Sequence, residues 1–227
     1  MRRKTIITAI FGLAVIGLLS CEKDDLNNAT VQLEFNTVTT ESGLKSAAAN
    51  SIMFSEGHII LESIEFETET DSDSTAVEFE IESYITLDFA TGETSPDLSA
   101  IQIAPGLYTE IEIEFELWDG TEQASIDLTG TWTDADGAEH PVRLLMPLGQ
   151  EFSLEIEGEF TVEENTSMVA QVTFDPNSWF LGEAGNLLST AVADEDGVIV
   201  ISPDQNSNIY DIIEDAIDNT SEVEIEM

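Results

Sequence analysis

Apolar and polar residues alternate along most of this chain with a period of two. In residues 77–82 and again in residues 111–117, every odd position is apolar and every even position is glutamate. Successive side chains of a β-strand point to opposite faces, so this pattern predicts strands with one face in a core and the other in water. Further segments of the same kind are residues 31–35, 58–66, 126–128, 152–162 and 168–174.

Turn-forming pairs separate these segments. Pro105-Gly106, Asp119-Gly120 and Asp136-Gly137 each lie between two alternating runs, and such pairs tolerate the positive φ angles of tight hairpins. About eight or nine short strands with no helical pattern between them favour an antiparallel β-sandwich, Ig-like or transthyretin-like. We expect this sandwich domain to occupy residues 31–182.

The pattern changes after this domain. Residues 197–201 read as a short strand, and Ile209, Ile213 and Ile217 then recur at helical spacing, which predicts one short amphipathic helix over residues 208–219. Residues 223–226 read as a possible edge strand. Because an isolated helix of this length is marginal in water, we expect residues 183–227 to pack on the sandwich as a strand-helix segment.

The first twenty residues have the layout of a secretory signal peptide: a basic start at residues 2–4, then an apolar run over residues 6–19. Cys21, the only cysteine of the chain, follows directly. The tetrad Leu18-Leu19-Ser20-Cys21 resembles the lipobox of bacterial lipoproteins, which implies fatty acyl chains such as palmitate on Cys21. An ordinary cleaved signal, or a short membrane anchor with a stray thiol, remains the alternative.

The residues after the cysteine extend this resemblance. The acidic stretch Glu22-Lys23-Asp24-Asp25 is similar to the surface-export signal of Bacteroidota-type lipoproteins, with residues 21–30 as a lipidated tether. Together these motifs imply a protein attached to the outer membrane through its lipid and facing the cell exterior.

Several later segments resemble uncharacterised Bacteroidota-type surface lipoproteins with a β-sandwich domain of unknown function. The segments are residues 85–92 leading to 103–108, residues 174–180, and residues 199–202 before 208–210. The resemblance implies a fold and a location, and it assigns no catalytic residue. A looser similarity to fimbrillin-type subunits departs from their pattern at Lys45, where an arginine cleavage site is expected.

The net charge of the chain limits the classes of partner that it can bind. From Cys21 onward three basic residues stand against 47 acidic ones, a formal charge of −44. A polyanion of this kind does not bind nucleic acid or anionic lipid through its own charge. Its 42% hydrophobic residues and 11 phenylalanines nevertheless provide a core, which favours a folded domain over a disordered one.

The acidic residues suggest two kinds of cation site. Rows of glutamate on neighbouring strands are in the first place solvated faces whose charge deters aggregation of sheets. Because like charges on neighbouring strands repel unless a cation lies between them, a weak shell of Ca²⁺ or Mg²⁺ is the alternative, and no tightly bound cofactor is expected. Two loops also resemble calcium sites, one with Asp134, Asp136 and Glu139 and one with Asp194 and Asp196. An Asp-Gly pair is equally a hairpin turn, and neither loop continues as an EF-hand does.

Three aromatic residues form a second candidate site. Tyr84, Tyr108 and Trp118 share the outward parity of their strands, and exposed rings in a concave site stack on sugars. Rings that simply lie at the rims and ends of strands are the alternative. By the same parity Trp132 belongs to the core, and Trp179 is an anchor where the sandwich ends.

Catalysis has little support, since His58 and His140 are the only histidines and no nucleophile elbow or paired zinc motif is present. The sequence therefore predicts a non-enzymatic surface lipoprotein that binds or scaffolds a glycan or a protein. Two alternatives remain at this point: a structural subunit of a surface appendage, and a glycoside hydrolase that uses two carboxyl groups.

Overall fold

A computed structural model describes residues 28–39, 51–69, 79–98, 100–120, 123–147, 151–217 and 222–226. The predicted signal peptide, Cys21, the stretch from Glu22 to Asp25 and Lys45 all lie outside these residues. Within the described part, none of the helices combines the length and apolarity that a membrane span requires.

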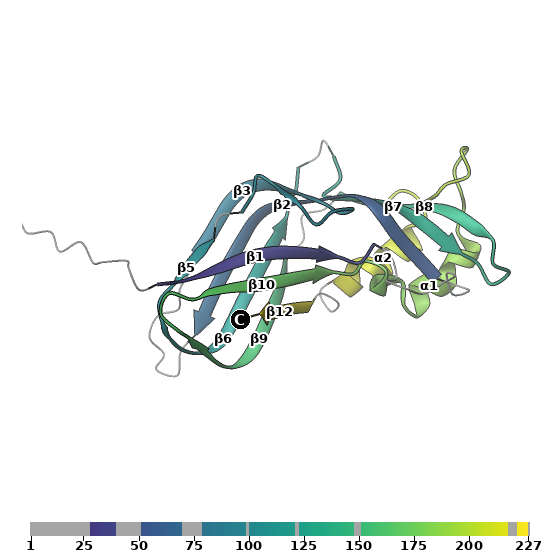
Figure 1. The fold of residues 1–227 in the computed structure, drawn as a ribbon. Helices are drawn as coiled ribbons and strands as arrows, with labels where there is room; N and C mark the ends of the chain where they lie inside the picture. Colours follow the sequence, from purple (N-terminus) through teal and green to yellow (C-terminus); the bar gives the residue numbers. More distant parts are fainter. Residues whose placement is uncertain are drawn as a thin grey trace, which may run out of the picture.

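The fold is mainly β and consists of two facing sheets (Figure 1). The strands of the smaller sheet are, in order, β12 (Glu222–Glu226), β10 (Ser167–Phe174), β1 (Ala29–Thr37) and β5 (Ile101–Ile103). The larger sheet has the order β11 (Ile199–Ile201), β8 (Glu139–Met146), β7 (Ile126–Thr133), β2 (Ser51–Glu69), β3 (Phe79–Asp88) and β4 (Thr94–Ser95). Two further strands, β6 (Gly106–Leu117) and β9 (Glu151–Val162), extend it because β6 pairs with β2 and β9 pairs with β6.

The long strand β2 connects the two ends of the larger sheet. Its first half pairs with β7 and its second half with β6, while β3 lies along its other edge. The pairing shifts register at Ser55 and again at Glu62, where β2 bulges. Each bulge reverses which side chains face the core.

The predicted mainly β fold with a short C-terminal helix is confirmed, and most of its strand pairs are antiparallel as expected, but two pairs are parallel. Strand β1 runs parallel to β10, and β11 runs parallel to β8. Parallel neighbours need a long crossover, and most of the chain lies between β1 and β10. The alternation of apolar residues encodes which face of a strand is buried, and it does not encode the direction of the neighbouring strand.

Three phenylalanines join the two sheets. Phe115 of β6 lies 5.8 Å from Phe35 of β1 and 6.1 Å from Phe174 of β10, measured between ring centroids. Phe115 and Phe174 are fully buried. Since the rings come from strands of both sheets, this trio is the centre of the sandwich core.

Short helices cover the end of the molecule opposite to the start of β1, beneath β7 and β8 in Figure 1. The predicted helix is present as α2 (Ser207–Ile217), and the predicted edge strand is β12. The sequence did not reveal α1 (Glu183–Leu187) or the 3-10 turns at Ser178–Phe180 and Leu188–Thr190, because segments of three to five residues are too short to show a helical period. The residues of this region that join the common core are Trp179, Phe180, Ala184, Leu188, Ile209, Tyr210, Ile213 and Ile217.

Tyr210 of α2 is 2% exposed, and its hydroxyl has no hydrogen-bond partner in the described structure. Burial, and then the nearby charges of Glu214 and Asp211, raise the pKa of Tyr210 to about 12. An unfolded tyrosine ionises near pH 10, so this group's contribution to stability is complete below about pH 10 and is lost as pH rises through about 12.

Tyr210→Phe should therefore remove a part of the alkaline loss of stability. At neutral pH we expect a change of less than about 1 kcal/mol, because the removed hydroxyl makes no hydrogen bond. Urea unfolding at about pH 8 and about pH 11 measures both values. An unchanged alkaline slope in the variant would show that Tyr210 does not titrate as described.

Candidate functional site: an acidic aromatic groove

A groove of about 350 Å³ lies on the outer face of the larger sheet, where β3, β2 and β6 run side by side. Two aromatic rings, four glutamates and two serines line it. They are Glu62, Ser63, Glu80, Glu82, Ser83, Tyr84, Glu116 and Trp118, which we call the acidic aromatic groove. The structure thus places two of the three predicted aromatic residues in one site.

The bulge of β2 shapes this groove. Against β6, Glu62 is the extra residue, because Leu61 and Ser63 pair with the adjacent residues Leu117 and Glu116, and its side chain is exposed. Against β3 the extra residue lies on β3 itself, between Glu82 and Ile85. Bulges commonly redirect one side chain next to a functional site. Here the bulge brings a carboxylate to the outer face beside Ser63, whose hydroxyl donates to Glu116 Oε2 at 3.2 Å.

Tyr84 and Trp118 form an edge-to-face pair in the groove. Their ring centroids are 5.6 Å apart and their planes meet at 79°. Tyr84 is 47% exposed, and the Gln123 side-chain amide donates to its hydroxyl. The Trp118 backbone N–H donates to Ile60 O at 3.1 Å. The pair is therefore held by Gln123 from the loop after β6 and by the backbone of β2, while about half of the Tyr84 side chain stays exposed.

Gly120 packs directly against the Trp118 ring. A Cβ atom placed on Gly120 would lie 1.8 Å from Trp118 Cζ2, well inside van der Waals contact. Only a residue without a side chain allows the loop after β6 to close on the indole in this way. Gly120 is thus a positioning residue for the groove, although it does not line it.

Gly120→Ala should displace the Trp118 ring while the fold persists, because the atoms in the way are the far end of one side chain. We expect a changed Trp118 indole environment by NMR and a loss of unfolding free energy below about 1 kcal/mol. Gly106→Ala is the matched control, since the nearest atom to its added Cβ is 3.6 Å away. An indole signal that is the same in both variants would contradict the packing.

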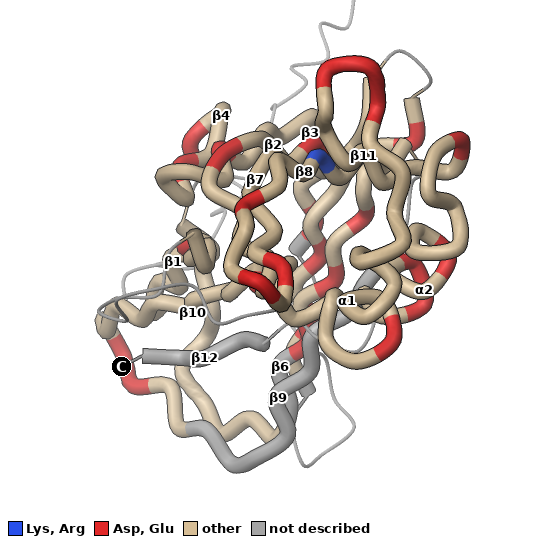
Figure 2. The backbone as a smooth tube through the Cα atoms, turned by 90° about the vertical axis from the view of Figure 1, so that its right-hand side faces the viewer, with Lys and Arg blue, Asp and Glu red and all other residues tan. Residues whose placement is uncertain are grey.

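The face around the groove is strongly acidic. Directly opposed pairs across the strands include Glu65 with Glu80 and with Glu114, and Glu67 with Glu112. Arg143 on β8 is the single lysine or arginine of the described residues, and it donates two hydrogen bonds to Asp127, at 2.8 and 2.7 Å. Figure 2 shows one blue segment beside β8 against many red ones. Arg143 is thus already paired with Asp127, and it does not line the groove.

The two predicted calcium loops share one geometry, which is that of a turn. Asp134 Oδ1 accepts from the N–H groups of Asp136 and Ala138, at 2.9 and 2.8 Å. Asp194 Oδ1 accepts in the same way from the N–H groups two and four residues further on, at 2.9 Å each. One oxygen of each carboxylate therefore serves its own loop, as in an Asx turn.

The other acidic side chains of these two loops do not cluster into a metal-binding group. His140 Nε2 lies 3.0 Å from Asp134 Oδ2, and this hydrogen bond, followed by the one from Ala138, holds the pKa of Asp134 below its usual value. Asp136, Glu139 and Asp196 are exposed. In the described residues no three side chains of His, Cys, Asp or Glu are placed to hold a metal ion.

The expectation that Tyr108 faces outward is wrong. Tyr108 is 4% exposed, and its hydroxyl donates to Ala104 O at 2.7 Å. The register of β6 with β9 shifts between Tyr108 and Glu110. The extra residue of this shift lies on β9. Tyr108 joins the core together with Ile113 and Phe115, so the alternation does not run unbroken along β6. The predictions for Trp132 and Trp179 are confirmed, since they are 5% and 3% exposed.

Sequence reasoning missed Glu62, Ser63, Gly120 and Gln123 as parts of the site. The break in alternation at residues 59–64, where three apolar residues precede Glu62 and Ser63, is the signal that could have located the bulge. No family model, curated protein or solved structure matches this chain. The functional argument therefore rests on the geometry of the groove.

Proposed function

We propose that this protein is a non-catalytic surface lipoprotein of the outer membrane, and that the acidic aromatic groove binds a glycan. The observation that carries the proposal is the half-exposed Tyr84 ring beside Trp118 in a concave site. Sugars present a C–H face that packs on an aromatic ring. The groove's volume of about 350 Å³ lies within the range of small-ligand sites.

The polar side chains of the groove suit the other faces of a sugar. Carboxylates accept hydrogen bonds from hydroxyl groups, and hydrogen bonds to charged acceptors are stronger than neutral ones. Glu62, Glu82 and Glu116 are exposed, so they can rotate to meet a ligand. The combination of ring faces and acceptors thus matches the alternating apolar and hydroxyl surfaces of a sugar.

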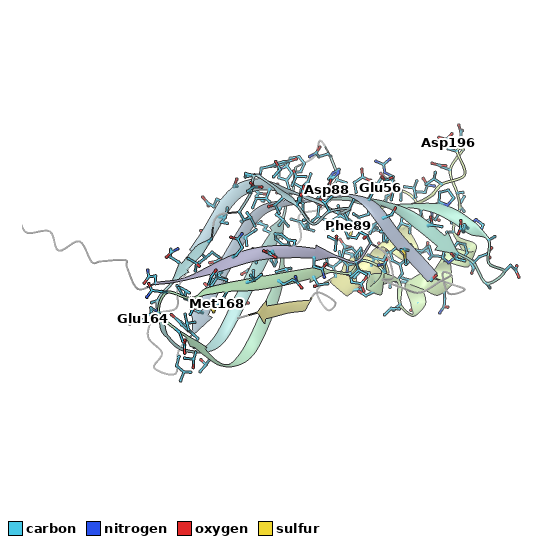
Figure 3. The ribbon with its side chains drawn as sticks, viewed as in Figure 1. Glu56, Asp88, Phe89, Glu164, Met168 and Asp196 are labelled. Atoms are coloured by element: carbon cyan, nitrogen blue, oxygen red, sulfur yellow. The ribbon has the colours of Figure 1, made fainter. Side chains whose placement is uncertain are left out.

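The proposed anchor fits the position of the first strand. Strand β1 begins at Ala29, so the seven residues after a lipidated Cys21 would reach at most about 25 Å from the membrane. Figure 3 places Glu164 and Met168 at the end where β1 begins and Asp196 at the opposite end. In the proposed arrangement the first end faces the membrane, and the helices and the Asp194 loop face away from it.

The test is glycan binding by the mature chain, residues 21–227 with Cys21→Ser. Trp118→Ala should weaken binding of the best ligand by at least about tenfold, roughly 1.4 kcal/mol, because it removes a stacking surface. Leu107→Ala is the matched control, since Leu107 is 45% exposed on β6 but outside the groove. Absence of glycan binding, or equal binding by both variants, would contradict the proposal.

A further inference from the structure

We infer that the acidic aromatic groove selects glycans whose rings carry free amino groups, such as a polymer of glucosamine. This inference rests on the proposed glycan function and specifies its ligand. The aromatic pair provides the surface on which a sugar ring stacks. The acidic side chains around that pair determine which charge the ligand must carry.

The charges that line the groove are all negative. Glu62, Glu80, Glu82 and Glu116 surround the two rings, and the neighbouring face adds opposed glutamates on β2 and β6. Arg143, the only described cation, pairs with Asp127 on the β7–β8 side of the sheet. An acidic or sulfated glycan is therefore repelled, and a protonated amine is attracted.

An amino sugar uses both parts of the site at once. Its ammonium group donates charge-assisted hydrogen bonds to carboxylates, and a cation near the face of Tyr84 or Trp118 is attracted by the ring quadrupole. Its C–H face packs on the open ring. A neutral sugar packs on the ring but brings no positive charge to the carboxylates.

The backbone under the groove favours a sugar over an extended peptide. Strand β2 forms the floor between β3 and β6, and residues 63–66 are paired on both sides. A bound peptide gains affinity and register by pairing its main chain with a free strand edge, and β2 at the centre of the groove offers none. A ligand recognised only by side chains, as a glycan is, suits this arrangement.

Three β-1,4-linked oligomers of equal length test the inference: glucosamine, N-acetylglucosamine and glucose. They share one backbone and differ in charge. We expect calorimetry on the mature Cys21→Ser chain to show glucosamine bound at least about tenfold more tightly than either neutral oligomer. The preference should shrink as salt rises from about 0.1 M to about 1 M, where the Debye length falls from about 10 Å to about 3 Å.

Two matched variants separate the groove from the overall charge. Glu62→Gln, Glu82→Gln and Glu116→Gln together should reduce the preference for glucosamine to less than about twofold. Glu93→Gln, Glu163→Gln and Glu195→Gln change the net charge equally at exposed positions outside the groove, and this control should keep the preference. An equal loss in both variants would overturn the inference, because bulk charge would then explain the binding.

The other outcomes distinguish the inference from the proposed function. Equal binding of all three oligomers, dependent on Trp118, would overturn charge selection and leave glycan binding intact. Failure of all three to bind would overturn both. A lysine oligomer that binds more tightly than glucosamine, and requires Trp118, would overturn the assignment to a glycan in favour of a basic peptide.

Discussion

Replacing Phe115 with alanine is expected to lower the free energy of unfolding by about 3–5 kcal/mol, the usual cost of emptying a buried phenylalanine site. Phe115 is fully buried and touches Phe35 and Phe174 of the opposite sheet. Removing its ring therefore leaves a cavity between the two sheets, where neither can close without moving the other. Urea unfolding of residues 21–227 with Cys21→Ser, at fixed salt, measures the change.

Leu107→Ala on the same strand is the control, with an expected loss below about 1 kcal/mol because Leu107 is 45% exposed. If Phe115→Ala does not fold, Phe115→Leu keeps most of the volume and should cost about 1–2 kcal/mol. A Phe115 variant no less stable than the Leu107 variant would mean that the two sheets do not pack through this ring.

The second large loss of stability is expected on substitution of Asn177, whose side chain joins its own loop to the backbone at Phe54 and at Val38. Its Oδ1 accepts from the Phe54 N–H at 3.0 Å, and its Nδ2 donates to Val38 O and Asp175 Oδ1 at 3.0 Å each. Asn177→Ala should cost about 2–4 kcal/mol, because the Phe54 N–H and the Val38 carbonyl each lose a partner in a partly buried place.

Asn186→Ala is the matched control, since Asn186 is exposed in α1 and should change stability by less than about 0.5 kcal/mol. Asn177→Asp adds a second test: it keeps an acceptor for Phe54 but puts a carboxylate beside Asp175, so its loss should be similar or larger. Stability equal to that of the Asn186 variant would show that the Asn177 side chain does not hold these segments together.

The comparison of sequence with structure shows what a period of two can predict. Parity with Ile126 and Leu128 predicts that Trp132 lies in the core, and it is buried. The same rule predicts Tyr108 outside, yet it is buried, because the alternation of β6 breaks between Tyr108 and Ile113, where its pairing with β9 also shifts register. Parity thus holds between bulges and fails across them, since one extra residue moves every later side chain to the other face.

The groove shows a second limit. Tyr84 and Trp118 are 34 positions apart in the chain, and their parity alone gave no reason to bring them together. The pairing of β2 with both β3 and β6 does so. The bulge at Glu62 and the packing of Gly120 on the indole depend on the tertiary arrangement of that loop. The chemistry of the site was therefore visible in the sequence, while its assembly was not.

The Asp134 and Asp194 loops illustrate an ambiguity that local sequence does not resolve. An Asp-x-Asp-Gly stretch is compatible with a cation site and with a turn. In the structure the first carboxylate of each loop accepts two backbone N–H groups of its own loop. Whether such a loop is a turn or a cation site depends on whether its carboxylate oxygens accept backbone N–H groups or face a cation. Only the three-dimensional arrangement shows this.

The most direct test of the proposed glycan site uses the three tryptophans as internal probes. Trp118 lines the groove, whereas Trp132 and Trp179 are buried. Each contributes one indole N–H signal to a ¹H–¹⁵N NMR spectrum of the mature Cys21→Ser chain, and Trp118→Phe identifies the first. On titration with the three oligomers in turn, we expect at least one oligomer to shift the Trp118 signal while the Trp132 and Trp179 signals stay in place. No shift with any oligomer, or a larger shift at Trp132 or Trp179 than at Trp118, would contradict it.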